Sequence, residues 1–167
     1  QGGAETLKPT YKANVQNGLP IVRFDGGDSL TFESLTLTNF TVFAVAKRAT
    51  DAAVMFPVGN ASGSEFLGHY SDDVIYIRDT FDTASSAAIN TAAFDIYEWH
   101  RTGTTPSAKR NGANVPLTGN SRYNMVLSMI GGRSATKSTG DIGEIVAYNV
   151  ALSDADRTKV RNYLATK

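Results

Sequence analysis

Two segments of the chain combine aromatic and arginine side chains at the spacing of a β-strand. Residues two apart on a strand point to the same face, so Tyr76 and Arg78 share one face of their segment, and Tyr97 and Trp99 share one face of theirs. Sugar-binding sites place aromatic rings against the apolar side of the sugar and planar polar groups against its hydroxyls. We therefore predict a ligand-binding face formed by Tyr76, Arg78, Tyr97 and Trp99.

Trp99 also has a second interpretation. It is the only tryptophan of the chain, and tryptophan is highly buried on average, which favours a place in the core. In that case Tyr97 and Trp99 line the core, and the opposite face of the strand, with Phe94 and Ile96, points outward.

A glycine-rich turn offers the best candidate for a metal site. Asp25 and Asp28 flank two glycines in this turn. Calcium binds several oxygen ligands at once, and two carboxylates on flexible backbone supply part of such a set. The same pattern also arises from turn geometry alone. Calcium is the only cofactor that the sequence suggests, with Asp25 and Asp28 as its ligands.

No catalytic constellation is recognisable in the sequence. A glycosidase needs two carboxylates about 5–9.5 Å apart across the scissile bond. Asp141 and Glu144 are three residues apart, so on a regular strand they point to opposite faces. Neither histidine, His69 or His100, lies in the context of a nucleophile elbow. We expect a protein that is not an enzyme.

Glu144 lies among apolar neighbours. It shares a strand face with Ile142 and Val146 in the segment 142–150. An unpaired buried charge is costly, so we expect Glu144 to form a buried ion pair rather than to act as a functional acid. The candidate partners are Arg101, Arg133 and Arg23.

The elements that must position these residues are short strands. Alternating or continuous β-branched and aromatic runs predict nine of them: 21–24, 29–32, 41–47, 53–58, 65–70, 74–78, 94–101, 125–130 and 142–150. Glycine and asparagine turns separate the runs, and Asn111-Gly112 is typical of a hairpin turn. The Ala-, Ser- and Thr-rich segment 80–91 is expected to be a loop. Many short strands with such punctuation favour a two-sheet antiparallel sandwich, an all-β fold.

One helix is predicted at the end of the chain, over residues 153–165. Ser153 can cap it, and Asp154 and Asp156 lie in the first turn, where the helix dipole favours negative charge. Val160, Tyr163 and Leu164 form one apolar stripe, which we expect to be buried against the sandwich.

Length and composition are those of a single domain over residues 1–167. The chain has no cysteine, and its 16 basic residues balance 16 acidic ones. Nucleic-acid binding is not expected, because no basic stripe is present. Membrane insertion is not expected either, because no apolar run approaches the ~20 residues of a span. The start at Gln1, with no initiator Met, suggests part of a longer or processed protein.

Several segments, taken in order, resemble the laminin-G-like branch of the concanavalin-A-like lectin and glucanase superfamily, in its bacterial or phage form. Residues 17–30 resemble its opening strand pair and residues 41–46 the next core strand. Residues 110–112 are similar to its hairpin, residues 140–149 to a late strand, and residues 151–164 to the closing helix. The resemblance implies a jelly roll, and the superfamily includes lectins, adhesion modules, glycan-cleaving enzymes and structural proteins of virus particles.

Two classes of function follow from this combination. The first is a non-catalytic binding or adhesion module for surface glycan or another cell-surface polymer, on a phage particle or a bacterial surface protein. The alternative is a structural decoration, fibre-tip or oligomerisation domain of a virus particle, whose partners would be copies of itself or other particle proteins. Both place the protein outside the cell, at a cell surface or in a virion, and the missing acid motif makes a glycoside hydrolase the weaker reading.

Overall fold

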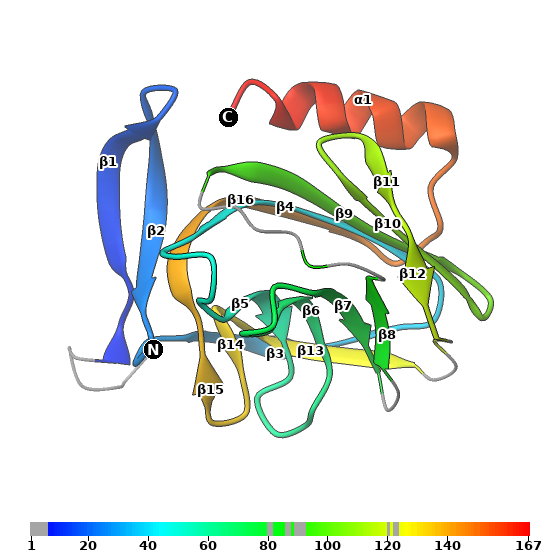
Figure 1. Ribbon diagram of the computed structural model, residues 1–167, viewed down its shortest axis with the longest axis horizontal. Helices are drawn as coiled ribbons and strands as arrows, with labels where there is room; N and C mark the ends of the chain where they lie inside the picture. Colours follow the sequence, from blue (N-terminus) through cyan, green and yellow to red (C-terminus); the bar gives the residue numbers. More distant parts are fainter. Residues whose placement is uncertain (1–6, 80–81, 86–87, 89–92, 120, 122–123) are drawn as a thin grey trace.

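A computed structural model of the protein describes residues 7–79, 82–85, 88, 93–119, 121 and 124–167. Two antiparallel sheets of seven strands each face one another, and a third, two-stranded hairpin lies beside them (Figure 1). Sheet A has the order β1 (Thr10–Gln16), β2 (Leu19–Asp25), β16 (Thr139–Tyr148), β4 (Phe40–Arg48), β9 (Asp95–Thr102), β10 (Thr105–Arg110) and β11 (Ala113–Val115).

Sheet B lies below sheet A in Figure 1 and carries the hairpin on its outer side. Its order is β12 (Leu117–Thr118), β8 (Asp82–Ser85), β7 (Ile75–Arg78), β6 (Phe66–His69), β5 (Met55–Gly59), β13 (Met125–Ile130) and β3 (Leu30–Leu37). The hairpin consists of β14 (Gly132–Arg133) and β15 (Thr136–Lys137). The all-β sandwich expected from the sequence is thereby confirmed, and each of the nine predicted strands is present.

The central strand β4 explains why residues 41–47 form a continuous apolar run. Val42, Ala44 and Ala46 point into the core between the sheets. Phe43 and Val45 point outward, where a second apolar cluster lies beneath the C-terminal helix. Because both faces of β4 are covered, neither face needs polar side chains.

The core between the sheets contains the aromatic side chains of β9. Tyr97 and Trp99 are 2% and 0% exposed. Their rings stack with centroids 5.6 Å apart, and the His69 ring of sheet B meets Tyr97 edge-on at 5.0 Å. The opposite face of β9, with Ile96, packs in the cluster beneath the helix.

Buried arginines connect the core to its surrounding loops. Arg101 is 1% exposed and donates to the Leu37 carbonyl at 2.9 Å and to Ser121 Oγ at 2.8 Å. Its guanidinium lies 3.5 Å from the Asp79 carboxylate. Each buried charge therefore has acceptors around it, as a low-dielectric interior requires.

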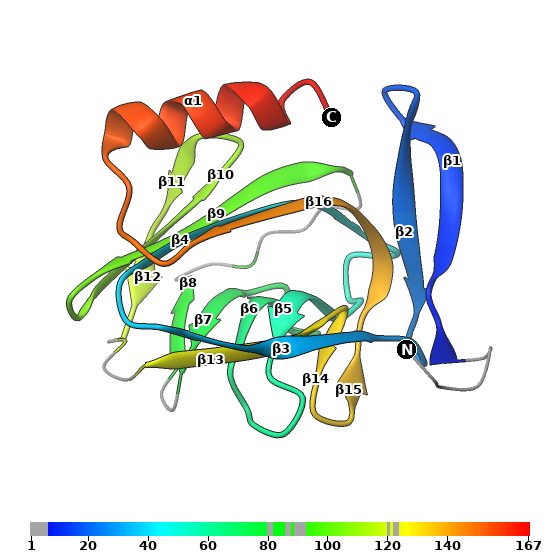
Figure 2. The same cartoon turned by 180° about the vertical axis from the view of Figure 1, so that it is seen from behind.

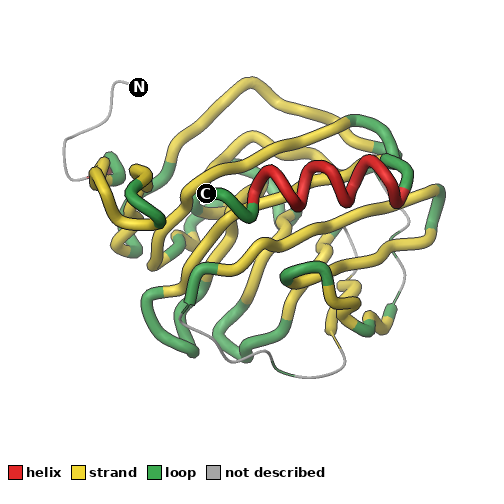
Figure 3. The backbone as a smooth tube through the Cα atoms, turned by 90° about the horizontal axis from the view of Figure 1, so that it is seen from above, coloured by secondary structure: helices red, strands yellow, loops and turns green. Residues whose placement is uncertain are grey.

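Helix α1 (Asp154–Leu164) covers the outer face of sheet A (Figures 1 and 2). Seen from above, it lies over the strands of that sheet (Figure 3). The Ser153 side chain accepts a hydrogen bond from the Asp156 backbone N–H, which confirms the predicted cap. Leu164 is 1% exposed and belongs to the apolar cluster of Phe43 and Val45.

The predicted burial of Tyr163 is wrong, because its side chain is 49% exposed. Val160 is half-buried against the cluster. The helix touches the sheet along a narrow line, so a residue only one position before Leu164 already points away from the sheet.

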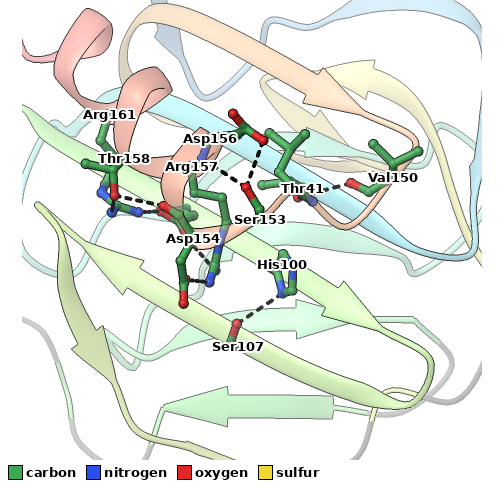
Figure 4. A network of polar contacts seen from close by, with 12 residues as sticks. Thr41, His100, Ser107, Val150, Ser153, Asp154, Asp156, Arg157, Thr158 and Arg161 are labelled. Carbon is green, nitrogen blue, oxygen red and sulfur yellow. Dashed lines mark hydrogen bonds and ion pairs between the residues drawn. The ribbon is translucent and has the colours of Figure 1, made fainter.

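Ion pairs hold α1 on sheet A. Glu98 of β9 is 1% exposed and bonds Arg157 Nη1 at 2.7 Å through Oε1. Its other oxygen, Oε2, accepts from Arg161 Nη1. Figure 4 shows this network at the helix, where Arg157 also reaches Asp154 and Thr41 bonds the Val150 carbonyl. The helix and the sheet are therefore joined by matched charges as well as by apolar contact.

The prediction for Glu144 is wrong in its face and its partner. The pairing of β16 with β4 shifts register between Ile142 and Glu144, which indicates a bulge at Gly143. The extra residue turns Glu144 to the outer face, where its side chain is 25% exposed and lies 3.5 Å from Lys167 Nζ. The three arginines expected as its partners contact other groups: Arg23 with Asp141, Arg101 with Asp79, and Arg133 with Tyr70.

Two further differences concern elements. The expected loop 80–91 contains strand β8, and the rest of that segment lies outside the described residues apart from residue 88. Strands β1, β10, β11, β12, β14 and β15 were not predicted. The predicted Asn111-Gly112 turn connects β10 to β11, with φ angles of +50° and +82°. Within the described ranges, no helix is long and apolar enough to cross a bilayer.

Candidate functional site

The outer face of sheet B carries a cluster of aromatic rings that is separate from the core. Residues Phe56, Phe66, Tyr70 and Tyr76 form it, and together with Arg133 they are called the outer cluster below. The ring centroids of Phe56 and Phe66 are 4.3 Å apart. Tyr70 lies 5.5 Å from Phe56, and Tyr76 lies 5.7 Å from Phe66.

Strand pairing decides that these rings face outward. In the β6–β7 ladder, Leu67 pairs with Ile77, and both are in the core. The neighbouring pair, Phe66 with Arg78, must then project from the other side of the sheet. Outer positions of both strands therefore gather on one surface.

The outer cluster combines two fully buried rings with two rings that are only partly buried. Phe56 and Phe66 are both 0% exposed, so their rings support the surface without reaching solvent. Tyr70 and Tyr76 are half-buried. The Tyr76 hydroxyl donates to Asp72 Oδ2 at 2.6 Å, which fixes the ring against its own turn.

Arg133 lies over the rings. Its guanidinium carbon is 5.0 Å from the Phe66 centroid, 5.2 Å from Tyr70 and 5.6 Å from Phe56. Nη2 donates to the Tyr70 hydroxyl at 2.7 Å. A cation over aromatic faces is attracted by their negative potential, which holds this arginine over the cluster.

The hairpin of β14 and β15 brings Arg133 to the cluster because of close backbone packing on β5. A Cβ atom on Gly59 would lie 2.4 Å from the Gly132 carbonyl oxygen and 2.9 Å from Arg133 Cβ. Only glycine at position 59 permits this approach. Ser134 N–H then bonds the Asn60 carbonyl at 2.8 Å and fixes the hairpin along the β5–β6 turn.

That turn is itself rigidly built. Asn60 Oδ1 accepts from the N–H groups of Ser62 and Gly63, at 3.0 and 3.1 Å. Asn60 Nδ2 donates to Glu65 Oε2 at 3.0 Å. The turn carries the Ser64 carbonyl 3.5 Å from Arg133 Nη1. The outer cluster is thus pre-organised by loops on both of its sides.

The four predicted binding residues divide between two places. Tyr76 and Arg78 lie on the outer face of sheet B, as half-buried side chains. Tyr97 and Trp99 lie in the core and have no accessible ring face, so the predicted four-residue surface does not exist. The reason is the phase of β9: its other face packs under α1, which leaves Tyr97 and Trp99 to fill the interior.

The two candidate calcium ligands, Asp25 and Asp28, hydrogen-bond backbone N–H groups of the turn that contains them. Asp25 Oδ1 accepts from the Gly27 N–H at 2.9 Å, and Asp28 Oδ2 accepts from the Asp25 N–H at 3.2 Å. Burial raises the pKa of Asp28 from its usual value. Among the described residues, no group of three or more acidic, histidine or cysteine side chains gathers as a metal site. A calcium site at Asp25 and Asp28 stays a prediction.

A serine–histidine contact on sheet A is the arrangement nearest to a catalytic pair. Ser107 Oγ lies 3.4 Å from His100 Nδ1 (Figure 4). Burial, reinforced by Arg157, lowers the pKa of His100. No carboxylate in the described part of the chain hydrogen-bonds this ring, so the pair has no third member of a hydrolytic triad among these residues.

A groove of about 470 Å³ lies at the end of α1, between the β1–β2 and β10–β11 turns. Three of its polar side chains are already engaged. Asn17 bonds the Lys167 carbonyl, Asn111 bonds Asp95 and the Ile96 N–H, and Arg161 bonds Glu98. A ligand there would compete with these bonds, whereas stacking on the tyrosine rings of the outer cluster would leave their hydroxyl bonds to Arg133 and Asp72 in place.

Comparison with known proteins supports the fold. No protein-family model matches the chain, and no curated protein matches its sequence. Among solved structures, domain 4 of the extracellular GH43 arabinanase AbnA of Geobacillus stearothermophilus, in complex with arabinotriose, has a TM-score of 0.67 at 13% identity, over 96% of this chain and 82% of that one.

Two further structures share this architecture. The CBM40 module of Ruminococcus gnavus IT-sialidase, bound to α2,3-sialyllactose, has a TM-score of 0.64 at 16% identity, over 91% of this chain and 98% of that one. A heptameric pentraxin of Limulus polyphemus has a TM-score of 0.57 at 10% identity, over 95% of this chain and 84% of that one. At such identities the matches support the fold alone, an antiparallel β-sandwich.

Sequence reasoning missed four of the five residues of the outer cluster, all except Tyr76. Phe66 and Tyr70 were inside a predicted strand, and their spacing about Gly68 puts them on one face. Pairing that strand with the one containing Tyr76 would have brought the three rings together. Arg133 carries no local signal, because it reaches the cluster only through the fold of the β14–β15 hairpin onto Gly59.

Proposed function

We propose that the protein is a non-catalytic glycan-binding module whose binding surface is the outer cluster of sheet B. The observation that carries the proposal is the arrangement of two half-buried tyrosines and a guanidinium over aromatic rings on one rigid, outward-facing sheet surface. Aromatic faces bind the apolar side of a sugar ring, and hydroxyl and guanidinium groups bind its hydroxyls.

The fold neighbours support the same class of function. Two of them are carbohydrate-binding domains whose structures contain sialyllactose or arabinotriose, and both match more than nine-tenths of this chain. Within this fold we keep the laminin-G-like assignment as our proposal. A secreted, cell-surface or particle-borne location suits such a module, and its ligand would then be a surface polysaccharide.

A weak single site fits this geometry. The cluster is a surface rather than a deep cavity, and an open site buries only part of a sugar. We expect a monovalent dissociation constant in the millimolar range, so that adhesion needs several copies on one particle or surface.

Assembly is the second candidate function, and exposed apolar side chains on an edge strand favour it. Tyr11 and Val15 of β1 are 67% and 40% exposed, and β1 is the outermost strand of sheet A. An unpaired strand edge with exposed apolar side chains is a surface on which another chain can add. Self-association through β1 would also supply the several copies that weak glycan binding requires.

A glycan array tests the binding proposal. The chain is displayed in many copies, and the parent is compared with Tyr76→Ala and with Tyr163→Ala, a matched change of a half-exposed tyrosine on α1. We expect glycan binding by the parent and by Tyr163→Ala, and a loss of about tenfold or more in Tyr76→Ala, because stacking on one ring is lost. Absence of binding to any glycan, or equal binding by all three proteins, would contradict the proposal.

A further inference from the structure

Arg133 differs from six other described arginines in what neutralises it. Six arginines contact a carboxylate within the described residues: Arg23, Arg48, Arg101, Arg110, Arg157 and Arg161. Arg133 has no such contact with any described residue. Its hydrogen bonds go to the Tyr70 hydroxyl and the Ser64 carbonyl, which are both uncharged, and its Nε has no partner.

The acidic side chains of the two flanking turns are used elsewhere. Glu65 bonds the Asn60 amide in the β5–β6 turn. Asp72 bonds the Tyr76 hydroxyl and the Val74 N–H in the β6–β7 turn. Each acid is thereby held by its own turn, and Arg133 keeps its full positive charge on the surface of the cluster.

Holding a cation in this way costs free energy unless something compensates it. Arg133 is half-buried, and the three ring faces beneath it supply part of the compensation. Their attraction holds the guanidinium over the cluster but leaves its charge unneutralised. A planar guanidinium fork matches the two oxygens of a carboxylate, which it binds by two parallel hydrogen bonds.

We infer that the outer cluster selects glycans that carry a carboxylate, with Arg133 as the residue that binds the acidic group and the tyrosines as the surface for the sugar ring. This inference rests on the proposed function of the same surface. It adds the chemical class of the ligand, an acidic sugar such as a uronic or sialic acid, and the residue that determines specificity.

The test uses two oligosaccharides that differ only in the acidic sugar, namely sialyllactose and lactose, on the multivalent full-length chain. We expect the parent to bind sialyllactose at least about tenfold more tightly than lactose, as is typical of a charge-assisted hydrogen-bonded pair. Arg133→Gln should remove that preference and leave lactose binding within about twofold. Arg133→Lys, which keeps the charge but not the fork, should lose most of it.

Arg23→Gln is the matched control, because it removes the same charge from a half-exposed arginine of sheet A that is paired with Asp141. It should keep the parent's preference. Equal binding of both oligosaccharides by the parent would overturn the inference and leave the proposed function standing, whereas no binding of either would count against both. An equal loss in Arg23→Gln and Arg133→Gln would reduce the effect to net charge and also overturn it. If Arg133→Gln does not fold, Arg133→Lys decides between the same outcomes.

Discussion

The two outer faces of the sandwich differ in whether their arginines are paired with a carboxylate. On sheet A, the buried carboxylate of Glu98 meets two arginines of α1, and the helix covers an apolar cluster. On sheet B, an arginine lies over aromatic rings without a carboxylate partner among the described residues, and its tyrosines remain partly exposed. On the first face, the charges of Glu98 and its two arginines are paired within the chain. The second has the features of a surface that a ligand completes.

This difference separates side chains that stabilise from side chains that bind. Both faces combine buried aromatic or aliphatic side chains with arginine, so residue type alone does not distinguish the two faces. What distinguishes them is whether each charge finds its partner inside the chain. The predictions below test that distinction, beginning with the largest expected effect.

The covered face should depend strongly on its central acid. Glu98→Gln leaves Arg157 and Arg161 without the carboxylate that both contact, and we expect the free energy of unfolding to fall by about 3–5 kcal/mol. Urea denaturation measures this loss. Lys159→Gln is the control, because its ion pair with Asp156 is exposed and should contribute less than about 1 kcal/mol. Equal effects of both changes would contradict the account of this face.

The apolar part of the same face provides a second test. Leu164→Ala should lower the free energy of unfolding by about 2–5 kcal/mol, because a fully buried side chain is removed. Tyr163→Ala, one residue earlier and 49% exposed, should change it by less than about 1 kcal/mol. Thermal melts of the two variants compare them directly, and an unchanged melting temperature in Leu164→Ala would mean that the helix is loosely attached.

The core that both faces share should weaken in acid. His69 is buried with neither ring nitrogen hydrogen-bonded in the described structure, and burial, reinforced by Arg48 and Arg110 and partly opposed by Asp73, lowers its pKa to about 3. The unfolded chain therefore binds a proton below the ordinary histidine pKa that the folded chain does not. Stability is complete above about pH 6.5 and falls as the pH drops toward 3.

The size of this effect should be about 2–3 kcal/mol between pH 6.5 and 4.5. Urea denaturation at the two pH values measures it, and His69→Phe should flatten the profile. A parent protein that is equally stable at both pH values would refute the assignment. The test also bears on the comparison of the two faces. If glycan binding is lost in acid, unfolding caused by His69 in the shared core would explain the loss, without any change in the outer cluster itself.

The open face should contribute least to stability. Arg133→Gln strands no carboxylate in the described structure and removes a cation that is only partly compensated, so we expect the free energy of unfolding to change by no more than about 1 kcal/mol. Chemical denaturation beside Glu98→Gln gives the contrast. A loss as large as that of Glu98→Gln would show that Arg133 is a structural residue, and the distinction between the faces would fail.

Local pattern was enough to predict the sandwich, nine of its strands and the capped helix. Alternation and turn residues are local properties, and they determined the elements without knowledge of their neighbours. The bulge at Gly143 was not predictable in this way, because it depends on pairing with β4, and it turned Glu144 to the other face.

The candidate site was predicted only in part for a related reason. Alternation gave two possible faces for β9 but did not say that α1 would cover one of them, which places Tyr97 and Trp99 inside. Tyr76 and Arg78 were correctly placed together on one face of their strand. Arg133 is 55 residues further along the chain than Arg78, and only tertiary structure brings its hairpin to the cluster.

The central claim is that glycan binds at the outer cluster of sheet B, and a map of backbone amide shifts on titration tests it most directly. The isotope-labelled chain is titrated with millimolar oligosaccharide while the amide signals are followed by NMR. We predict that the largest changes fall in residues 60–78 and 131–137, around Tyr70, Tyr76 and Arg133. Changes centred instead on the groove at the end of α1, near Asn17, Asn111 and Asn162, would contradict the account.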